Sequence, residues 1–422
     1  SGEVGRARGL LQRHAALREK INDPAPELSF GGRPIGAVVN TKDREMIDLF
    51  LEFGADINAR SDWWAGSFGV LDGVDPDFAP FLISRGARVD VHAAAHLGML
   101  DKLRELVAAD PNVVHARGGD GQMPLHFAKS VAITDFLLEH GADIDALDVD
   151  HEGTPAQWMI RDRTELARHL VRHGARTDIL MAVALGDVEL VRKFLDDDPA
   201  SIHTSVSPKY FPMRDPRAGG HIYIWTLGKN KSAHIVARDF AREHVYKLLM
   251  ERSPDEVKFA QACALGDEHV VRALLTRDPN LARRLSADER RKLVDAAEDE
   301  NTAAVRFMLE AGWPLEARGD ENATALHWAA WLGNAEMVRD LVKHGAPLEV
   351  RGDTFNLTPL GWALHGSTNS WRCKTGDYAG VVQTLLAAGA VAPPDSDHAS
   401  ESVRAVLESH AAVDRKAHGG SA

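Results

Sequence analysis

The chain of 422 residues is long enough for two or three ordinary domains or for one extended array of repeats. Its formal net charge of -13 argues against nucleic-acid binding, because proteins that bind nucleic acids usually present a basic surface to the phosphates. The sequence has two cysteines and no apolar run of membrane-spanning length, and its start lacks the pattern of a signal peptide. We therefore expect a cytoplasmic protein that binds neither nucleic acid nor membranes.

The first 25 residues are predicted to form an N-terminal capping helix. Charged and apolar residues are mixed in "VGRARGLLQRHAALREKI", which starts at Val4. The terminal element of a stacked array must be amphipathic in this way, because one of its sides faces water. By the same argument, residues 394–422 are predicted to form a C-terminal capping helix followed by a disordered tail.

Between these flanks, residues 26–393 carry a pattern that returns about every 33 residues. Each copy has two amphipathic stretches at helical spacing, and in many copies a Gly-Ala pair follows the second stretch. Glycine readily takes the left-handed conformation that ends a helix, so each pair is predicted to end a second helix. The glycines of these pairs are Gly54, Gly86, Gly141, Gly174, Gly345 and Gly389.

The clearest copy is "TALHWAAWLGNAEMVRDLVKHGAPLEVRGD", which starts at Thr324, and the next begins with "TPLGWALHG" at Thr358. These sequences resemble the ankyrin repeat, whose T-P-L-H-x-A signature opens the first of two helices. The resemblance implies an all-α ankyrin-repeat solenoid of about eleven helix-pair units joined by hairpin loops. Copies between Ile179 and Arg290 lack the Gly-Ala pair, and in this the chain is similar to stand-alone bacterial ankyrin repeat proteins with degenerate central repeats.

The resemblance also sorts the aromatic and histidine side chains. It implies that the signature histidines, His126 and His327, are structural, whereas hairpin tips and the residue four after each signature histidine face a concave groove. The aromatic residues implied to lie in the core are Phe127, Trp158, Trp328 and Trp362. The candidates for binding in the groove are Asp62, Trp63, His96, Arg161, Trp331, Phe355 and His365.

Two short patterns contain residue types that bind metals, and neither predicts a metal site. "HAAAH" places His92 and His96 four residues apart on one helix face, a spacing used by zinc sites, but no third ligand is evident. "DVDHE", residues 148–152, offers carboxylates that could hold Mg²⁺ or transfer protons, or that simply cap a hairpin tip. We expect no bound metal and no cofactor.

The interval from Ile179 to Ser232 holds 53 residues, against about 33 in a normal repeat. The surplus, residues 203–231, contains three prolines and a Gly-Gly and is predicted to be a long inserted loop. The alternation of residue types in "HIYIW", residues 221–225, predicts a strand in the returning arm of this loop. The candidate binding residues in the loop are Arg214, Arg217, Trp225 and Lys229.

Three interpretations of the groove and the loop remain open. The preferred function is a binding protein whose groove and inserted loop hold a protein partner, with Trp63, Trp331 and Phe355 as anchors. The alternative is an enzyme or small-molecule sensor with an aromatic pocket under the loop. As an enzyme, it would use metal-independent acid–base chemistry, as in a lyase, an isomerase or cyclase, or a hydrolase. The third is a purely structural loop that seals the stack. The candidate acid–base residues are Asp148, Asp150, His151, Asp215, His221 and Tyr223.

Overall fold

The computed structural model describes residues 2–354, 356–393 and 398–418. Phe355, the start of the predicted C-terminal cap and the tail 419–422 lie outside the described residues. The chain divides into two compact units, Ser1–Val245 and Tyr246–Ala422. Within the described residues the regular elements are helices, and the β-type pairing is one isolated antiparallel bridge between Ser205 and Ser232.

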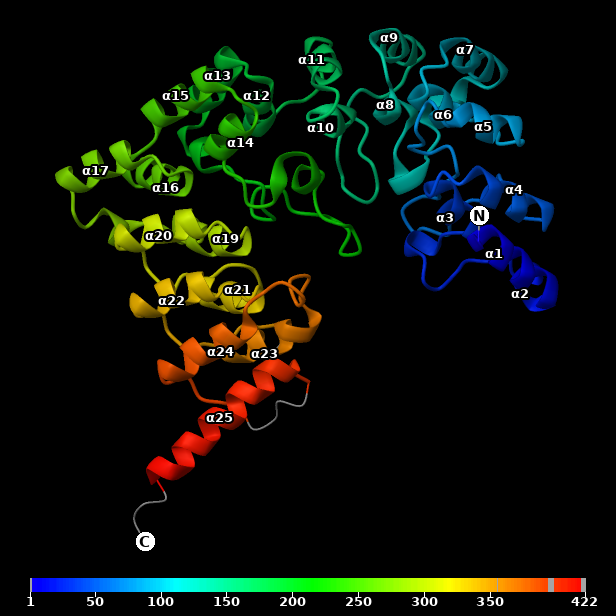
Figure 1. Ribbon diagram of the computed structural model, residues 1–422. Helices are drawn as coiled ribbons and strands as arrows, with labels where there is room; N and C mark the ends of the chain where they lie inside the picture. The colour runs from blue at the N-terminus through cyan, green and yellow to red at the C-terminus, as the bar shows by residue number, and fades with distance from the viewer. Residues whose placement is uncertain (1, 355, 394–397, 419–422) are drawn as a thin grey trace. The chain divides into compact units, whose positions relative to one another are not determined.

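Unit 1 begins with two N-terminal helices, after which helix pairs follow one another along the chain (Figure 1). Its first helices α6, α8 and α10 pack on one another, and its second helices α9 and α11 do the same. Its helices are α1 (Gly2–Arg13), α2 (Ala15–Glu19), α3 (Pro34–Asn40), α4 (Arg44–Glu52), α5 (Ala79–Ser84), α6 (Val91–His96), α7 (Leu100–Ala109), α8 (Pro124–Phe127), α9 (Val131–Glu139), α10 (Pro155–Met159), α11 (Thr164–Arg172), α12 (Ile179–Leu185), α13 (Val188–Asp197), α14 (Ala233–Asp239) and the start of α15 (Glu243–Arg252).

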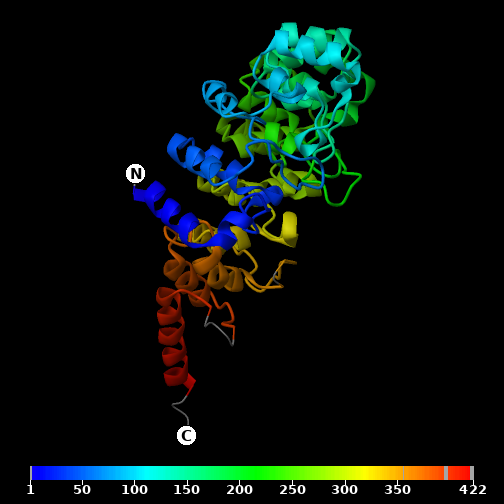
Figure 2. The ribbon, with the colours of Figure 1, turned by 90° about the vertical axis from the view of Figure 1, so that its right-hand side faces the viewer.

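Unit 2 shows the same two layers more regularly. The first helices α19, α21 and α23 form one layer, the second helices α20, α22 and α24 form the other, and α25 packs on α24 at the red end of the ribbon (Figure 2). Its helices are α16 (Asp255–Leu265), α17 (Glu268–Arg277), α18 (Ala287–Arg290), α19 (Lys292–Glu298), α20 (Thr302–Glu310), α21 (Ala325–Trp331), α22 (Ala335–Lys343), α23 (Pro359–Asn369), α24 (Tyr378–Ala387) and α25 (Glu401–His418). No helix among the described residues of the chain is both long and apolar enough to cross a bilayer.

Short helical turns occur in the connections. The 3-10 turns are η1 (Ser29–Gly31), η2 (Pro111–His115), η3 (Gly119–Gly121), η4 (Pro199–His203), η6 (Leu281–Arg284) and η7 (Asp320–Asn322), and a π-helical turn, η5, spans Ile224–Gly228. Three of the 3-10 turns follow a second helix that lacks the Gly-Ala ending, namely η2, η4 and η6.

The two helices of a repeat differ in sequence because they differ in burial. All seven residues of the first helix α12, "ILMAVAL", are buried, and this helix packs on α13 and α14. The second helix α13 buries only Val191 and Leu195 and exposes charged residues on its outer face. A continuous apolar first helix and an amphipathic second helix are what a two-layer stack requires.

The predicted all-α solenoid is confirmed. Among the described residues, ten helix pairs, the single helix α5 and the short helix α18 lie between the N-terminal helices and α25, in agreement with about eleven predicted units. All six glycines of the Gly-Ala pairs take left-handed backbone conformations, with φ between 87° at Gly345 and 97° at Gly389. These glycines therefore end second helices as predicted.

The strand predicted for residues 221–225 is wrong, because this segment is a helical turn that leads into η5. The amides of Trp225 and Thr226 both donate to the carbonyl of Ile222, at 3.0 Å each. Ile222 and Tyr223 are both buried although they are adjacent, and a half-buried strand would bury alternate residues instead. The bridge between Ser205 and Ser232 closes the inserted loop at its base.

Candidate binding site

The hairpin tips of two consecutive repeats in unit 1 lie side by side. The carbonyl of Asp120 accepts hydrogen bonds from the amides of Val149 (2.8 Å) and Asp150 (3.2 Å), which belong to the next tip. Gly121 has a φ of +70°, and a Cβ there would lie 2.3 Å from the side chain of Val149. Only glycine therefore allows the two tips to approach this closely.

Asp148 holds the second tip in shape. Its two carboxylate oxygens accept hydrogen bonds from the amides of His151 (2.6 Å) and Gly153 (2.8 Å) and from the indole N–H of Trp158 (2.8 Å). The side chain is buried, and three donors compensate its charge. This arrangement gives Asp148 a structural role in the tip. The sequence analysis included this role as the alternative in which the carboxylates cap a hairpin tip.

Asp150 and His151 contact the inserted loop directly. The amide of Gly219 donates to both the carbonyl and the Oδ1 of Asp150, each at 3.0 Å. His151 Nδ1 lies 2.8 Å from the carbonyl of Gly220, and the amide of Ile222 donates to the carbonyl of His151 at 3.2 Å. Both tip residues are buried beneath the loop.

Two further contacts fix the loop to residues at the ends of first helices in unit 1. The hydroxyl of Tyr223 donates to Oδ2 of Asp178 at 2.7 Å, and Asp178 also caps α12 by accepting from the amide of Met181. Burial raises the pKa of Tyr223 well above its ordinary value, and the carboxyl group of Asp178 adds to this rise. Arg161 donates to the carbonyl of Thr226 at 2.6 Å. Tyr223 and Arg161 are thus anchors of the loop.

Asp120 was missed by the sequence analysis. Burial raises the pKa of this carboxyl group to about 6; His151 opposes the rise, and the carboxylates of Asp150 and Asp148 add to it. Trp63 acts in the same direction as His151 and lowers the pKa. Asp120 stands about one repeat before Asp148 and Asp150, so the repeat period could have placed it here.

The cluster of Asp120, Asp150 and His151 has ligand types that metals accept. One ligand atom from each residue lies within 4.8 Å of the other two. Asp150 and His151 already bind the backbone of the loop at Gly219 and Gly220. Proton transfer is the other chemistry open to this group, since the pKa of Asp120 lies near neutrality.

The remaining acid–base candidates of the loop do not join this cluster by a hydrogen bond. Asp215 is held by Arg217 at 2.7 Å and 3.1 Å, and these side-chain hydrogen bonds lower the pKa of Asp215 to about 2. His221 accepts from the amide of Tyr223 at 3.3 Å and packs against Phe211. Burial lowers the pKa of His221 to about 4, so this imidazole is neutral at neutral pH.

The outer surface of the loop carries aromatic and cationic side chains. The guanidinium of Arg217 lies 4.2 Å from the ring centroid of Trp64, and the ring of Trp225 lies 6.0 Å from that of His151. Arg214, with a side chain that is 82% exposed, pairs weakly with Glu152 at 3.7 Å. Lys229 is also exposed, at the end of η5. We call the surface made by Trp64, Arg214, Arg217 and Trp225 the tip–loop face.

The other groove candidates of unit 1 lie near its N-terminal repeats. Asp62 pairs with Arg33 at 2.8 Å, and Trp63 is half-buried with its ring 4.8 Å from that of Phe30. His96 Nε2 lies 2.8 Å from the carbonyl of Val74. None of these contacts brings them to the inserted loop.

A cavity of about 550 Å³ lies in this N-terminal region rather than under the loop. Its walls include Phe30, Arg33, Phe68 and Asp72. Burial raises the pKa of Asp72, although Arg60 lies 2.9 Å away and acts in the opposite direction. One wall comes from η1 and α3, and the other comes from residues before α5, the single helix of the next repeat.

In unit 2 the candidates Trp331 and His365 belong to an aromatic group. Their rings lie 5.7 Å apart, and Trp331 also contacts Trp362 and Trp371. Trp371 is 66% exposed and lies in the turn between α23 and α24. This second exposed tryptophan was not among the predicted binding residues.

The signature histidines are structural, as predicted. The Nδ1 atoms of His126 and His327 accept from the amides of Met123 and Thr324, both at 3.1 Å. Their Nε2 atoms face carbonyl groups of the next hairpin loop, and burial lowers the pKa of each to about 4. Among the aromatic residues expected in the core, Trp362 is buried, whereas the following are half-buried: Phe127, Trp158 and Trp328.

The stacked helix pairs, capped tips and structural histidines define a repeat protein of the α-solenoid class. A family model for three consecutive ankyrin repeats matches residues 259–352 and 293–391, and a model for a single ankyrin repeat matches residues 120–149. Residues 120–149 and 259–391 therefore carry ankyrin repeats, and these matched repeats lie in both units.

Two solved structures similar to this chain are ankyrin repeat domains. The human ASB11 ankyrin repeat domain is 19% identical with a TM-score of 0.28, and the match covers 73% of this chain and 100% of that one. An ankyrin repeat domain from Acinetobacter baumannii AYE is 20% identical with a TM-score of 0.29, and the match covers 56% of this chain and 96% of that one.

Proposed function

We propose that the chain binds a protein partner through the tip–loop face. Ankyrin repeats generally mediate protein–protein interaction. The observation that carries the proposal is Trp225, which is 64% exposed although it stands on a loop fixed by hydrogen bonds to one hairpin tip and to residues at the ends of two helices. A large aromatic side chain held outward in this way loses little conformational entropy on binding, and tryptophan dominates many interfaces.

The charge of the loop indicates the charge of the partner segment that binds to it. Residues 203–231 contain five lysines and arginines and a single acidic residue, in a chain whose formal net charge is -13. Arg214 and Arg217 expose most of their side chains beside the aromatic rings. We infer that the partner presents an acidic segment with one apolar or aromatic side chain that packs on Trp225.

A selection from a random peptide library displayed on phage tests this proposal. The wild-type chain is expected to enrich acidic peptides with an apolar anchor, and Trp225→Ala is expected to lose them. Trp371→Ala is the matched control, because Trp371 is exposed to a similar degree in the other unit. Peptides that lose binding with Trp371→Ala instead would place the partner at the turn between α23 and α24 and contradict the proposal.

A second function, acid–base chemistry on a small molecule, is supported by one observation. The pKa of Asp120 near 6 suits a group that must both accept and donate protons at neutral pH, and His151 lies beside it. Thermal-shift profiling against a panel of metabolites tests this function. It requires a compound that stabilises the wild-type chain and does not stabilise Asp120→Asn, and it fails if no compound does so.

We also propose that the chain is located in the cytoplasm. Its support is that Cys263 and Cys373, the two cysteines of the chain, are free thiols, and that Cys263 is buried.

A further inference from the structure

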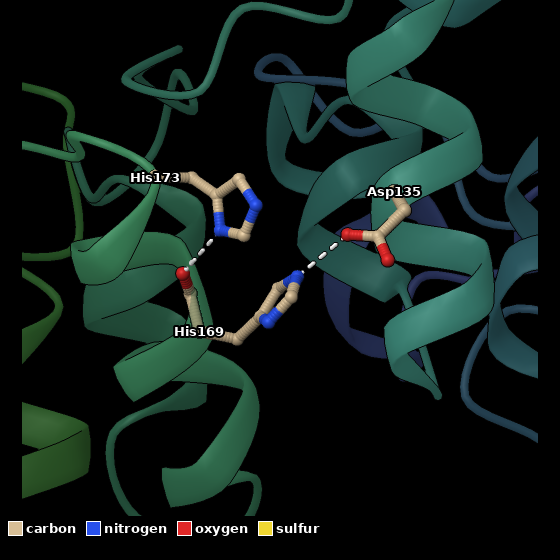
Figure 3. A group of neighbouring side chains, drawn as sticks. All are labelled: Asp135, His169 and His173. Carbon is tan, nitrogen blue, oxygen red and sulfur yellow. Dashed lines mark hydrogen bonds and ion pairs between the residues drawn. The ribbon is translucent and has the colours of Figure 1, made fainter.

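Asp135, His169 and His173 form a cluster outside the tip–loop face. Asp135 lies on α9, whereas His169 and His173 lie on and directly after α11, the second helix of the next repeat. One ligand atom of each residue lies within 4.8 Å of the other two. Figure 3 shows the three side chains turned toward the same space between the two helices.

The repeat architecture explains why these side chains meet. Asp135 and His169 are 34 residues apart, close to one repeat, so equivalent helices bring them together, and His169 Nε2 lies 2.6 Å from Asp135 Oδ1. His169 and His173 are four residues apart and share one face of the helix. Their ring centroids lie 4.2 Å apart. Two histidines at this spacing are a common pair of zinc ligands.

The hydrogen bond of His173 prepares its other nitrogen for a metal. Nδ1 of His173 lies 2.9 Å from the carbonyl of His169 (Figure 3). A carbonyl can only accept, so Nδ1 carries the proton and Nε2 of the neutral ring carries a lone pair. Metal-bound histidines are oriented by this kind of contact through the second ring nitrogen.

The backbone contact of His173 recurs in other repeats without the rest of the cluster. His140 and His344 place Nδ1 at 2.7 Å and 2.8 Å from the carbonyl four residues earlier. The residue at that earlier position is Phe136 for His140 and Asp340 for His344, so neither has a second imidazole there. The Asp135–His169–His173 cluster therefore adds two ligands to an ordinary helix ending, and His140 provides a matched control.

We propose that Asp135, His169 and His173 bind a zinc ion that joins α9 to α11. Two imidazoles and one carboxylate form a donor set that zinc accepts, whereas magnesium and calcium prefer oxygen alone. Ligand atoms around tetrahedral zinc lie roughly 3.3 Å apart, given the usual bond lengths, and the separations within 4.8 Å need only side-chain rotations to reach this. The side chain of Asp135 is 40% exposed, so water reaches the fourth position.

Isothermal titration calorimetry with zinc chloride, on the full chain without a polyhistidine tag, tests the proposal. The wild-type chain is expected to bind one zinc ion at this site, and Co²⁺ in its place is expected to give the visible absorption of a tetrahedral complex. His173→Ala is expected to weaken zinc binding at least about tenfold. This variant keeps the contact between His169 and Asp135, so its helices should fold normally, which circular dichroism will check.

Two control variants make the outcome decisive. His140→Ala removes the same backbone contact in the neighbouring repeat, and Asp120→Asn alters the other cluster of metal-binding residue types; both are expected to bind zinc as the wild type does. The proposal is overturned if zinc does not bind at micromolar concentrations. It is also overturned if His173→Ala binds as tightly as the wild type, or if Asp120→Asn is the variant that loses binding.

Discussion

Two neighbouring carboxyl groups, Asp120 and Asp148, show how the same residue type serves different ends in one site. Asp148 is surrounded by three donors that satisfy its charge, and it shapes the hairpin tip. Burial raises the pKa of Asp120 to about 6, and two other carboxylates add to the rise. The acidic motif at residues 148–152 was visible in the sequence. Whether a carboxyl group there meets hydrogen-bond donors or other carboxylates depends on how neighbouring hairpin tips pack, which the motif alone does not show.

The stability of the chain is predicted to depend on the titration of Asp120. The pKa of this group is raised in the folded protein, so the folded chain binds more protons than the unfolded chain between about pH 4 and pH 6, and stability falls as pH rises through this range. Asp120→Asn removes the titrating group and with it this decrease in stability with rising pH. The free energy of unfolding of the variant, relative to wild type, should rise by about 1 to 2 kcal/mol from pH 4 to pH 6.5, after allowance for partial exposure.

Urea denaturation at each pH provides the measurement, with Asp215→Asn as the control. The pKa of Asp215 is lowered to about 2, so its contribution to stability changes little above about pH 5, and in that range the control should run parallel to wild type. Parallel curves for Asp120→Asn and wild type would mean that Asp120 has an ordinary pKa.

Tyr223→Phe is predicted to loosen the inserted loop. The change removes the hydrogen bond to Asp178 and leaves one oxygen of a buried carboxylate with a weaker set of donors. We expect a loss of about 1 to 3 kcal/mol in the local stability of the loop. Hydrogen exchange of the amides in residues 219–228 measures it. Tyr210→Phe, on the same loop, should leave exchange unchanged, and equal effects of the two variants would refute the anchoring role of Tyr223.

At the scale of elements, the helices and the position of the inserted loop could be predicted from the sequence, whereas the conformation of the loop could not. Gly-Ala endings, capping threonines and apolar periodicity depend on local chemistry, and the six glycines have the predicted conformation. The conformation of residues 221–225 instead depends on contacts with residues about 70 positions earlier in the chain, such as those of His151. Five alternating residues without a partner strand are too few to decide between a strand and a helical turn.

Gly153→Ala is predicted to displace the loop from the hairpin tip. A Cβ at this position would lie 2.5 Å from Cγ2 of Ile222 and 3.1 Å from the indole nitrogen of Trp158. Overpacking of this kind costs about 1 to 3 kcal/mol. Trypsin should then cleave faster after Arg214 and Arg217. Gly36→Ala is the control, since a Cβ there meets nothing within 4 Å, and unchanged cleavage of Gly153→Ala would show that the loop does not depend on this contact.

At the scale of the whole molecule, a repeat period of about 33 residues predicts the stack and also predicts which residues of neighbouring repeats lie close together. It places Asp120 near Asp148 and Asp135 near His169. Exposure could not be predicted in the same way. Trp225 and Trp371 are exposed because irregular loops carry them out of the repeat pattern.

The charge of the molecule leads to a prediction about salt. The chain is acidic as a whole, whereas the inserted loop is basic, so an acidic partner segment would be attracted to the loop and repelled elsewhere. The affinity for a selected peptide should fall several-fold when the salt concentration rises from 50 mM to 500 mM, a range in which screening increases strongly (about 14 Å to about 4 Å in Debye length). Fluorescence anisotropy measures this, and an affinity that does not change with salt would exclude charge complementarity.

The central claim is that Trp225 anchors the partner, and calorimetry on wild-type chain, Trp225→Ala and Trp371→Ala with one selected peptide tests it most directly. We predict that Trp225→Ala raises Kd by at least about thirtyfold, as expected for a hot-spot tryptophan worth about 2 kcal/mol or more. Trp371→Ala should leave Kd within about twofold of wild type. A Kd for Trp225→Ala equal to that of the wild-type chain would contradict the account.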